Sequence, residues 1–305
     1  MGGAIMGLVF WLWCISLNLY VRRRRHNLVG RKDNQLLIMS NIKICIPSYK
    51  RPNDVRALRS VSPELQQKYY WLCVRDEEID EYKQNYPHCN YLNLGGEWRP
   101  EDSIGETRQR INEKMTGKIL VIDDDVEFSK TRIVEKIWKD EPFHYMRYDK
   151  DINTNDILEE MLEYLDDLMD KYPYGSVRAH GHPRDGRKFM PYRYDQVGIW
   201  CVWFNLDEFD TNVISYRHGP NDVEDVYMSL RFYELGYQIP QVSLYCIKKS
   251  KGTHSQKGGC SEITDRGLKH DLAVDWLVEK YPRQCHSRPS HLYGGTKTVR
   301  VKFKK

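Results

Sequence analysis

The sequence predicts an α/β fold, in which helices flank a mostly parallel sheet. In the first half of the chain, short apolar strands alternate with helical segments of about ten residues, which is the pattern of consecutive βαβ units. Ile119–Ile122 form an uninterrupted apolar run, as expected of a strand that is covered on both faces. With 305 residues and a hydrophobic content of 40%, the chain can form one large domain of this class.

The expected elements follow one another regularly from the first strand onward. Strands are short apolar runs, and helices have apolar residues three or four positions apart. The expected strands are Ile42–Ile46, Tyr69–Val74, Tyr91–Leu94, Ile119–Ile122, Val197–Leu206, Val242–Ile247 and Thr298–Phe303. The expected helices are Asp54–Val61, Glu77–Tyr86, the stretch between Ser103 and Gly117, Ile157–Lys171, Val223–Leu235 and Leu268–Tyr281. The expected basic loops are Gly175–Pro191 and Lys248–Gly259.

The helix before Ile119 carries clear local signals. Ser103 and Glu106 have the spacing of a capping box, in which each side chain caps a backbone N–H of the other residue. We expect Arg108 to neutralise a diphosphate, because a guanidinium offers two parallel donors where lysine offers a point charge. Arg110 lies two positions further along and is expected to face solvent.

Three consecutive carboxylates follow the strand Ile119–Ile122. In an extended chain Asp123 and Asp125 point to one side and Asp124 to the other. Like charges this close need a cation or hydrogen-bond donors, and two hard oxygen ligands suit Mn²⁺ or Mg²⁺. A solvated acidic turn is the alternative. The position at the carboxyl end of a buried strand, where open α/β sheets bind ligands, favours a metal site.

Charge and hydropathy divide the chain into three parts. The whole chain carries +4, residues 1–38 carry +5 and residues 280–305 carry +8, which leaves about −9 for residues 39–279. An acidic body with a basic C-terminal tail suggests that a polyanion binds at one edge, and a loose solubilising tail is the alternative. The eight cysteines include no C-x-x-C pair, and those in apolar runs are expected to be buried free thiols, as in a reducing compartment.

The first 38 residues allow two interpretations. Residues 1–21 are apolar and are followed by Arg22–Arg25, so they have the length of a membrane anchor that would keep the rest of the chain cytoplasmic. Alternatively, Met39 is the ordinary start of the protein and residues 1–38 are an extension of it. In both cases the catalytic domain is expected to span residues 39–279 and to face the cytoplasm.

Several motifs in this order resemble those of GT-A fold glycosyltransferases. The resemblance covers about residues 42–260, and within the GT-A class the chain is most similar to the TET-associated glycosyltransferases of bacteriophages. It implies a Rossmann-like GT-A domain with a DxD motif that transfers a sugar from a UDP-sugar. The motifs that carry it are IPSYKRP, SIGETRQRIN, ILVIDDDVEF, GPNDVEDVYMSLRFYELGY and KGTHS.

The nucleotide is expected to bind after the first two strands. Pro47, Tyr49 and Arg51 follow the first strand, where a base and ribose are expected, with Tyr49 stacked on uracil. Asp76 ends the second strand and can accept a hydrogen bond from the uracil imide. The plainer alternatives are a βα turn and a solvated acid. The nucleotide-sugar-binding candidates are Pro47, Tyr49, Arg51, Asp76, Arg108, Asp123 and Asp124.

The resemblance also implies a metal set. It assigns Asp123 to the sugar-nucleotide and the metal, Asp125 to the metal directly, and His254 to the remaining protein ligand. Imidazole can complete a Mn²⁺ shell beside two carboxylates, although a lone loop histidine usually has no such role. Candidates in the same loop for binding diphosphate or DNA phosphate are Lys248, Lys249 and Lys251.

Glu224 and Asp225 begin the helix that follows Asp222. Exposed N–H groups and the helix dipole stabilise anions there, which together with a cap from Asp222 is the structural explanation. The functional explanation makes this pair catalytic, with Asp225 as the general base for an acceptor hydroxyl. The reaction would then be a direct displacement with inversion, and a retaining enzyme would not need this base.

The favoured acceptor is a hydroxymethylated pyrimidine in DNA, such as 5-hydroxymethylcytosine in bacteriophage DNA. A flipped base needs an aromatic wall and its backbone needs cations, for which Trp98 and the segment Arg178–Tyr194 are candidates. Trp200 and Trp203 are further candidates, with burial in the core as the alternative. The rival functions are transfer to a glycan, lipid or protein at the cytoplasmic membrane face, and a non-catalytic binding module.

Overall fold

A computed structural model of the chain contains two compact units, Met1–Met39 and Ser40–Lys305, and every described element lies in the second unit. The expected membrane segment, residues 1–21, and the rest of residues 1–38 lie outside the described residues. Among the helices that are described, none is long and apolar enough to cross a membrane. The described residues are 40–98, 102–138, 141–149, 152–179, 191–249, 265–290 and 295–303.

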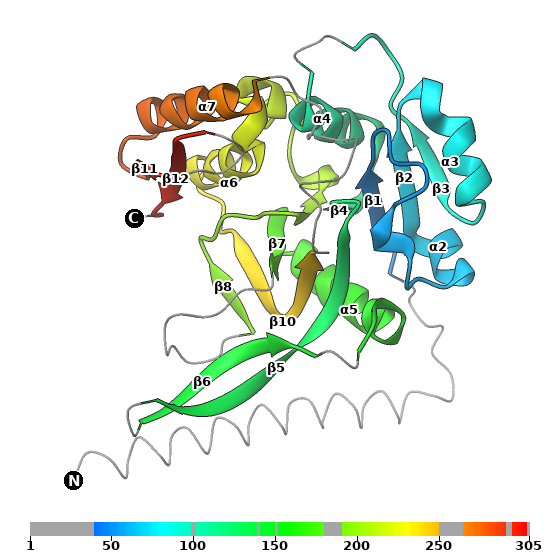
Figure 1. The fold of residues 1–305 in the computed structure, drawn as a ribbon, viewed down its shortest axis with the longest axis horizontal. Coiled ribbons are helices and arrows are strands. Elements are labelled where there is room, and N and C mark those ends of the chain that lie inside the picture. Colours follow the sequence, from blue (N-terminus) through cyan, green and yellow to red (C-terminus); the bar gives the residue numbers. More distant parts are fainter. Residues whose placement is uncertain are drawn as a thin grey trace. The chain divides into compact units, whose positions relative to one another are not determined.

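The second unit is an α/β fold (Figure 1). The strands are β1 (Lys43–Pro47), β2 (Tyr70–Val74), β3 (Asn90–Asn93), β4 (Lys118–Ile122), β5 (Val126–Trp138), β6 (Glu141–Tyr148), β7 (Tyr174–Ala179), β8 (Tyr192–Tyr194), β9 (Cys201–Asn205), β10 (Pro240–Lys249), β11 (Cys285–Pro289) and β12 (Lys297–Val301). The helices are α2 (Pro63–Tyr69), α3 (Ile79–Asn85), α4 (Ile104–Lys114), α5 (Thr154–Met169), α6 (Glu224–Glu234) and α7 (Arg266–Lys280).

The central sheet has the order β3-β2-β1-β4-β9-β7-β10-β5-β6, and β8 pairs with β10. Strands β1 to β4 are mutually parallel, β9 runs antiparallel to β4, and β7 and β10 are again parallel to each other. The predicted α/β class with a mostly parallel sheet is therefore confirmed. Because β1, β2 and β4 are parallel neighbours, the loops after them meet at one edge, which is the edge expected to hold the site.

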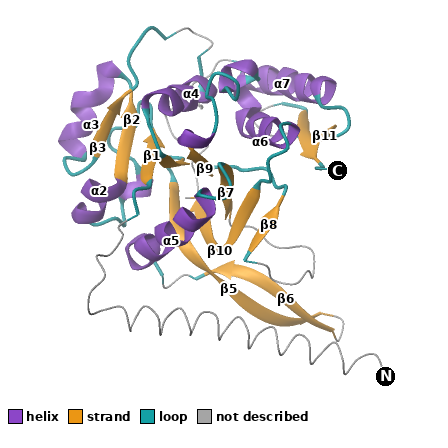
Figure 2. Ribbon diagram, turned by 180° about the vertical axis from the view of Figure 1, so that it is seen from behind, coloured by secondary structure: helices purple, strands orange, loops and turns teal. Residues whose placement is uncertain are grey.

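Both faces of the sheet are buried, which explains the continuous apolar runs in β1 and β4. On one face Ile44 and Ile46 pack in a cluster with α5, and on the other Cys45 packs in a cluster with α4 and α6. The alternation follows from the two-residue period of a strand. Figures 1 and 2 show α4 and α6 on the side of the sheet opposite α5, so each face has its own helical layer.

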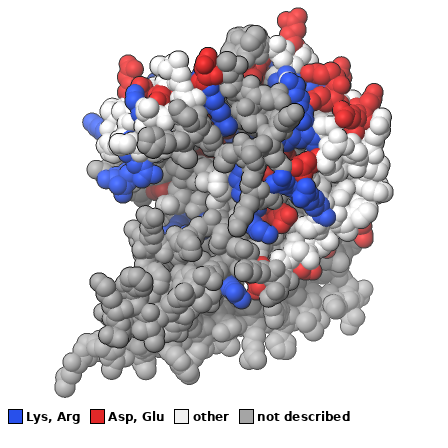
Figure 3. All heavy atoms as spheres, in the orientation of Figure 1, with Lys and Arg blue, Asp and Glu red and all other residues white. Residues whose placement is uncertain are grey.

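The basic C-terminal segment folds instead of forming a loose tail. Strands β11 and β12 pair as an antiparallel hairpin, and Cys285, Val299 and Val301 belong to a third apolar cluster with α6 and α7. The positive charge is thereby attached to the body of the domain, next to α6. Figure 3 shows Lys and Arg side chains gathered over the position of this hairpin.

Several local predictions are wrong. Ser103 is the N-cap of α4 without a side-chain cap bond, since its hydroxyl donates to the Asn221 carbonyl at 3.5 Å and Glu106 binds arginines instead. The segment Asp54–Val61 has only a 3-10 turn, followed by the unpredicted helix α2. Part of the loop expected at Gly175–Pro191 is strand β7, and Lys248 and Lys249 end strand β10. The long hairpin of β5 and β6 was not predicted either.

Candidate active site

Arg108 is the centre of a charged cluster at the carboxyl end of β4. Its side chain is 3% exposed, and its guanidinium lies 3.0 Å from Asp123 Oδ1 and 3.1 Å from Glu224 Oε1. It also forms an ion pair with Asp225. Three carboxylates, from the β4 edge and from the start of α6, therefore surround one guanidinium. The cluster brings together Arg108, Asp123, Glu224 and Asp225, as the sequence interpretation required of a single site.

A close approach of two helix starts brings this cluster together. A Cβ at Gly105 would lie 3.0 Å from Asn221 Oδ1 and 3.6 Å from the Glu224 Cβ. Glycine therefore leaves room for α4 to meet the turn before α6, where a larger side chain would press on Asn221. Arg108, one helical turn after Gly105, then reaches the first residues of α6. The expected cap by Asp222 is wrong, because Val223 is the N-cap and no side chain caps it.

The electrostatics of the cluster leave an excess of negative charge. Burial raises the pKa of Glu224, and the neighbouring Arg108 guanidinium opposes that shift. A buried carboxylate is costly unless a cation offsets it, so Arg108 is required to keep the cluster charged. Since one guanidinium faces three carboxylates, a further cation at this edge would be stabilised.

The side chains of Asp123 and Asp125 do meet on one side, although the chain turns at Asp124 and Asp125 and does not stay extended. Lys249 Nζ lies 3.5 Å from Asp123 Oδ2 and 3.5 Å from Asp125 Oδ2. Two carboxylates that converge on one ammonium form an oxygen-rich cation site, which fits Mn²⁺ or Mg²⁺. Among the described residues no group of three or more His, Cys, Asp and Glu side chains is arranged so that it could hold a metal ion by itself. His254 lies outside those residues, so its role stays a prediction.

Asp124 points to the opposite side and binds the loop after β1. Its carboxylate accepts hydrogen bonds from the Ser48 hydroxyl at 3.0 Å and from Arg51 Nη1 at 2.9 Å. Burial raises the pKa of Asp124 to about 6, although Arg51 opposes the shift. Ser48 also contacts the Tyr82 hydroxyl at 2.8 Å. In the structure Asp124 and Arg51 therefore hold the loop in place, and their binding of a nucleotide sugar stays a prediction.

Tyr49 lies at the edge of the same loop. The Arg75 guanidinium lies over the Tyr49 ring at 4.0 Å and over the Trp98 ring at 3.9 Å, so one cation is shared by both aromatics. Arg110 lies over Trp98 at 4.1 Å and pairs with Glu106 at 2.7 Å. The expectation that Arg110 faces solvent is therefore wrong, since its guanidinium lies against the Trp98 ring and pairs with Glu106.

The other sequence candidates lie where the strand order predicts. Pro47 ends β1, and Asp76 follows β2, where its carboxylate accepts a hydrogen bond from Asn93 Nδ2 at 2.6 Å. Trp203 is fully buried in β9 and donates to the Tyr172 carbonyl, so it belongs to the core. The residues that sequence reasoning missed are Ser48, Arg75 and Glu106, whose neighbours lie far away along the chain.

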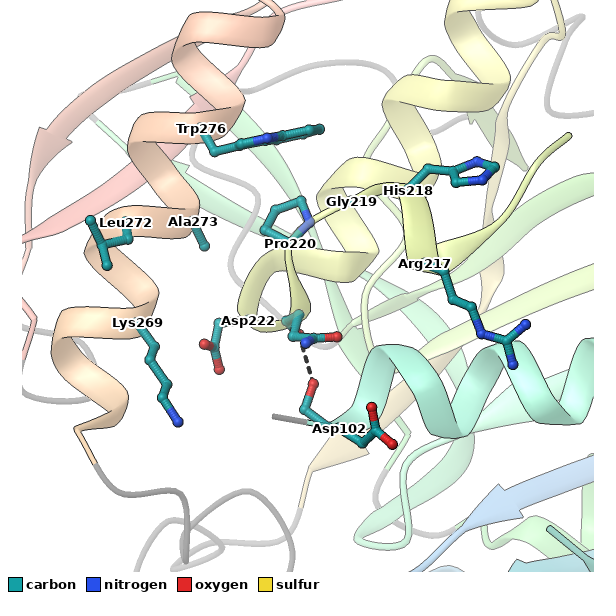
Figure 4. A pocket seen from close by; sticks show the side chains of 12 residues that line it. Asp102, Arg217, His218, Gly219, Pro220, Asp222, Lys269, Leu272, Ala273 and Trp276 are labelled. Carbon is teal, nitrogen blue, oxygen red and sulfur yellow. Dashed lines mark hydrogen bonds between the residues drawn. The ribbon is translucent and has the colours of Figure 1, made fainter. Parts of the chain in front are cut away.

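A pocket of about 570 Å³ opens between α7 and the turns before α6 (Figure 4), and its lining includes no residue of the charged cluster. Trp276 and Leu272 of α7 form one side, while Pro220 and Asn221 form the opposite side. Ser103, the N-cap of α4, completes the wall. The same two segments that carry Arg108 and Asp225 therefore border a partly apolar pocket. No sequence signal singled out Trp276.

Comparison with known proteins gives a family match. The family model described as TET-Associated Glycosyltransferase matches residues 42–259. No curated protein matches the chain. Among solved structures, S. aureus TarS 1–349 in complex with UDP-GlcNAc is 13% identical with a TM-score of 0.44, and the match covers 78% of this chain and 66% of that one.

A second similar structure is a putative nucleotide-diphospho-sugar transferase from Desulfovibrio desulfuricans G20. It is 12% identical with a TM-score of 0.37, and the match covers 80% of this chain and 99% of that one. The chain spans just under two thirds of the TarS 1–349 chain with UDP-GlcNAc. The family model covers most of the described unit, from β1 to the segment after β10. The chain belongs to the TET-associated glycosyltransferase family.

Proposed function

We propose that this protein transfers a sugar from a UDP-sugar to the hydroxymethyl group of a pyrimidine in DNA. The observation that carries the proposal is the convergence of Asp123, Glu224 and Asp225 on Arg108 at the carboxyl end of β4. Asp123 is one of the two carboxylates proposed to hold a cation for the diphosphate. Glu224 and Asp225 are the carboxylate pair proposed for the acceptor hydroxyl. Both parts of a sugar transfer are therefore supported at one edge of the sheet.

The donor side is supported by the residues after β1, β2 and β4. A divalent cation held by Asp123 and Asp125 would neutralise the charge that develops on the leaving diphosphate. Tyr49 and Asp76 lie after adjacent parallel strands, β1 and β2, where a uracil base can contact both an aromatic ring and a carboxylate. The metal and the base contacts are parts of this proposal.

Asp225 is proposed as the general base. It lies in the first turn of α6, where the helix N-terminus and the Arg108 guanidinium both stabilise a carboxylate. The acceptor oxygen attacks the anomeric carbon while the bond to the diphosphate oxygen breaks, and the electron pair leaves with UDP. Asp225 takes the proton of the acceptor hydroxyl, so the configuration at the anomeric carbon inverts.

The acceptor side is supported by the pocket and the basic hairpin. A flipped base needs an aromatic wall, and Trp276 offers one beside the segment that leads to Asp225. Exposed cations on the C-terminal hairpin, among them Arg288 and Arg300, can contact the phosphate backbone. Lys269 adds a cation at the pocket itself. DNA therefore fits this edge better than a neutral glycan does.

The test is a transfer assay with the full chain. The protein is incubated with Mn²⁺, a panel of UDP-sugars and DNA that contains 5-hydroxymethylcytosine or 5-hydroxymethyluracil, and the DNA is digested for mass spectrometry of nucleosides. A hexose or N-acetylhexosamine adduct that is lost in Asp225→Asn is expected. If UDP is released without any adduct, water accepts the sugar and the DNA acceptor is contradicted, and glycan, lipid and protein acceptors are tested next. If UDP-sugars bind without any turnover, the protein is a binding module.

A variant of the pocket tests the acceptor side separately. Trp276→Ala should raise the KM for DNA by about fivefold or more, since stacking on a base is worth about 1–3 kcal/mol, and it should leave donor hydrolysis unchanged. Leu268→Ala, at an exposed apolar residue of the same helix α7 outside the pocket, is the control and should leave both unchanged. An unchanged KM in Trp276→Ala removes the pocket from the acceptor site.

A further inference from the structure

Lys249 lies between the two carboxylates that are proposed to hold a metal. Its Nζ is 3.5 Å from Asp123 Oδ2 and also 3.5 Å from Asp125 Oδ2. The side chains are 20% exposed for Lys249 and 3% exposed for Asp125, so water screens this contact only in part. The ammonium thus stands where a divalent cation would contact both aspartates.

The register of the sheet explains this position. In the antiparallel pair of β10 and β5, Lys249 lies opposite Val126, the residue directly after Asp125. Its neighbour Lys248 lies opposite Glu127 and pairs with it at 3.6 Å. Since consecutive side chains of a strand point to opposite faces, only Lys249 can reach the aspartates.

Trp200 contacts both Asp123 and Lys249. Its carbonyl accepts a hydrogen bond from the Asp123 backbone N–H at 3.0 Å, and Lys249 Nζ lies over its ring at 4.9 Å. Trp200 has a φ of +62°, a left-handed conformation that is uncommon for a bulky residue and is typical of functional sites. One residue therefore positions both Asp123 and Lys249.

We propose that Lys249 and a divalent cation occupy the Asp123–Asp125 pair alternately. Without metal, the ammonium holds the two carboxylates together. When the metal binds, the Lys249 ammonium leaves the Asp123 and Asp125 carboxylates and moves along the Trp200 ring to the donor diphosphate. A flexible four-carbon stem allows this movement, and repulsion between two cations at one pair requires it. The inference rests on the metal and the diphosphate of the proposed function, and not on the DNA acceptor.

The experiment measures binding instead of turnover. Mn²⁺ affinity of the full chain is measured by electron paramagnetic resonance of free Mn²⁺, without nucleotide. Lys249→Met should bind Mn²⁺ at least about fivefold more tightly than wild type, because the competing charge is gone, whereas Lys249→Arg should stay within about twofold. At saturating Mn²⁺, the affinity of Lys249→Met for UDP should fall at least about fivefold, because the diphosphate loses a cation.

Lys130→Met is the control, since it removes the same charge from the neighbouring strand β5, where Lys130 pairs with Glu160 at 2.9 Å, and it should change neither affinity. Equal or weaker Mn²⁺ binding by Lys249→Met overturns the inference, and so does unchanged UDP affinity. If Lys249→Met melts early, Lys249→Gln must give the same shifts. If neither wild type nor Lys249→Met binds Mn²⁺ better than the variant with Asp123→Asn and Asp125→Asn, the metal proposal fails too. If the Mn²⁺ and UDP affinities change as expected but no DNA adduct forms in the transfer assay, only the proposed DNA acceptor is contradicted.

Discussion

Replacing Arg108 by methionine should destabilise the protein more than the loss of any surface arginine. Arg108 contacts Asp123 at 3.0 Å and Glu224 at 3.1 Å, and it also pairs with Asp225. The Glu224 side chain is only 9% exposed, so the variant would leave a buried carboxylate without its cation. Removing one partner of a buried pair costs about 3–5 kcal/mol. Methionine fills similar apolar volume, so the loss reports on the charge.

The assay is thermal unfolding followed by circular dichroism at pH 7.5. For a domain of this size, about 3–5 kcal/mol corresponds to a melting temperature lowered by roughly 6–20 °C. Arg231→Met is the control, because Arg231 is more exposed and pairs with Glu234 on the surface of α6. A surface pair of this kind is worth about 0–1 kcal/mol, so the control should melt within a few degrees of wild type.

The pH dependence gives a second, independent result. Burial already raises the pKa of Glu224 above its ordinary value, and removing Arg108 raises it further. An acid with a raised folded-state pKa stabilises the protein at low pH and loses that contribution as the pH rises through this pKa. The defect of Arg108→Met should therefore shrink as the pH falls from 7.5 toward about 4.3. A melting temperature within 2 °C of wild type at pH 7.5, roughly 1 kcal/mol or less, or a defect that grows on acidification, would refute this reasoning.

Three further predictions concern the loop, the core and the thiols. Because burial raises the pKa of Asp124 to about 6, the contribution of Asp124 to the free energy of unfolding should fall by about 2 kcal/mol between pH 4 and 7. Urea unfolding of Asp124→Asn should lack this part of the wild-type pH dependence, and an unchanged pH dependence contradicts the prediction. Gly175→Ala places a Cβ 2.2 Å from the Trp203 ring, so it should cost about 1–3 kcal/mol or more, and an unaltered melting curve would disprove the close packing. Burial raises the pKa of Cys89 to about 12 and of Cys285 to about 11. Alkylation of these two thiols, mapped by mass spectrometry, should therefore need denaturant. Rapid alkylation of the native protein would show that the thiols are accessible.

Much of the donor side could be predicted from the sequence because its signals are local. The run Ile119–Ile122 had to be a buried strand, and Asp123 and Asp125 were predicted to lie together and Asp124 apart, which holds although a turn at Asp124 and Asp125 and not an extended strand produces it. Parallel βα units bring the loops after their strands to one edge, so Asp76 and the residues after Pro47 could be assigned to that edge as well. These conclusions need only short-range periodicity and the rules of strand connection.

The capping box and the solvent-facing Arg110 show where local reasoning fails. The Ser103 and Glu106 spacing fits a cap, but Glu106 lies 2.7 Å from Arg217, a partner 111 residues away. A buried carboxylate gains more from two arginines than from one backbone N–H, so the tertiary ion pairs prevail over the cap. Arg110 is held inward by the same carboxylate and by the Trp98 ring.

The sequence by itself determined the α/β class, the aspartate pair at the end of β4 and the carboxylates that begin α6. These follow from hydrophobic periodicity and from the charge of helix and strand ends, which act over a few residues. Only the tertiary structure decided that Arg108 joins both carboxylate groups, that Trp276 lines a pocket with the turn before α6, and that Lys249 lies between Asp123 and Asp125. The register between β10 and β5 sets that last contact, and register depends on which strands pair, which no local pattern in this chain encodes.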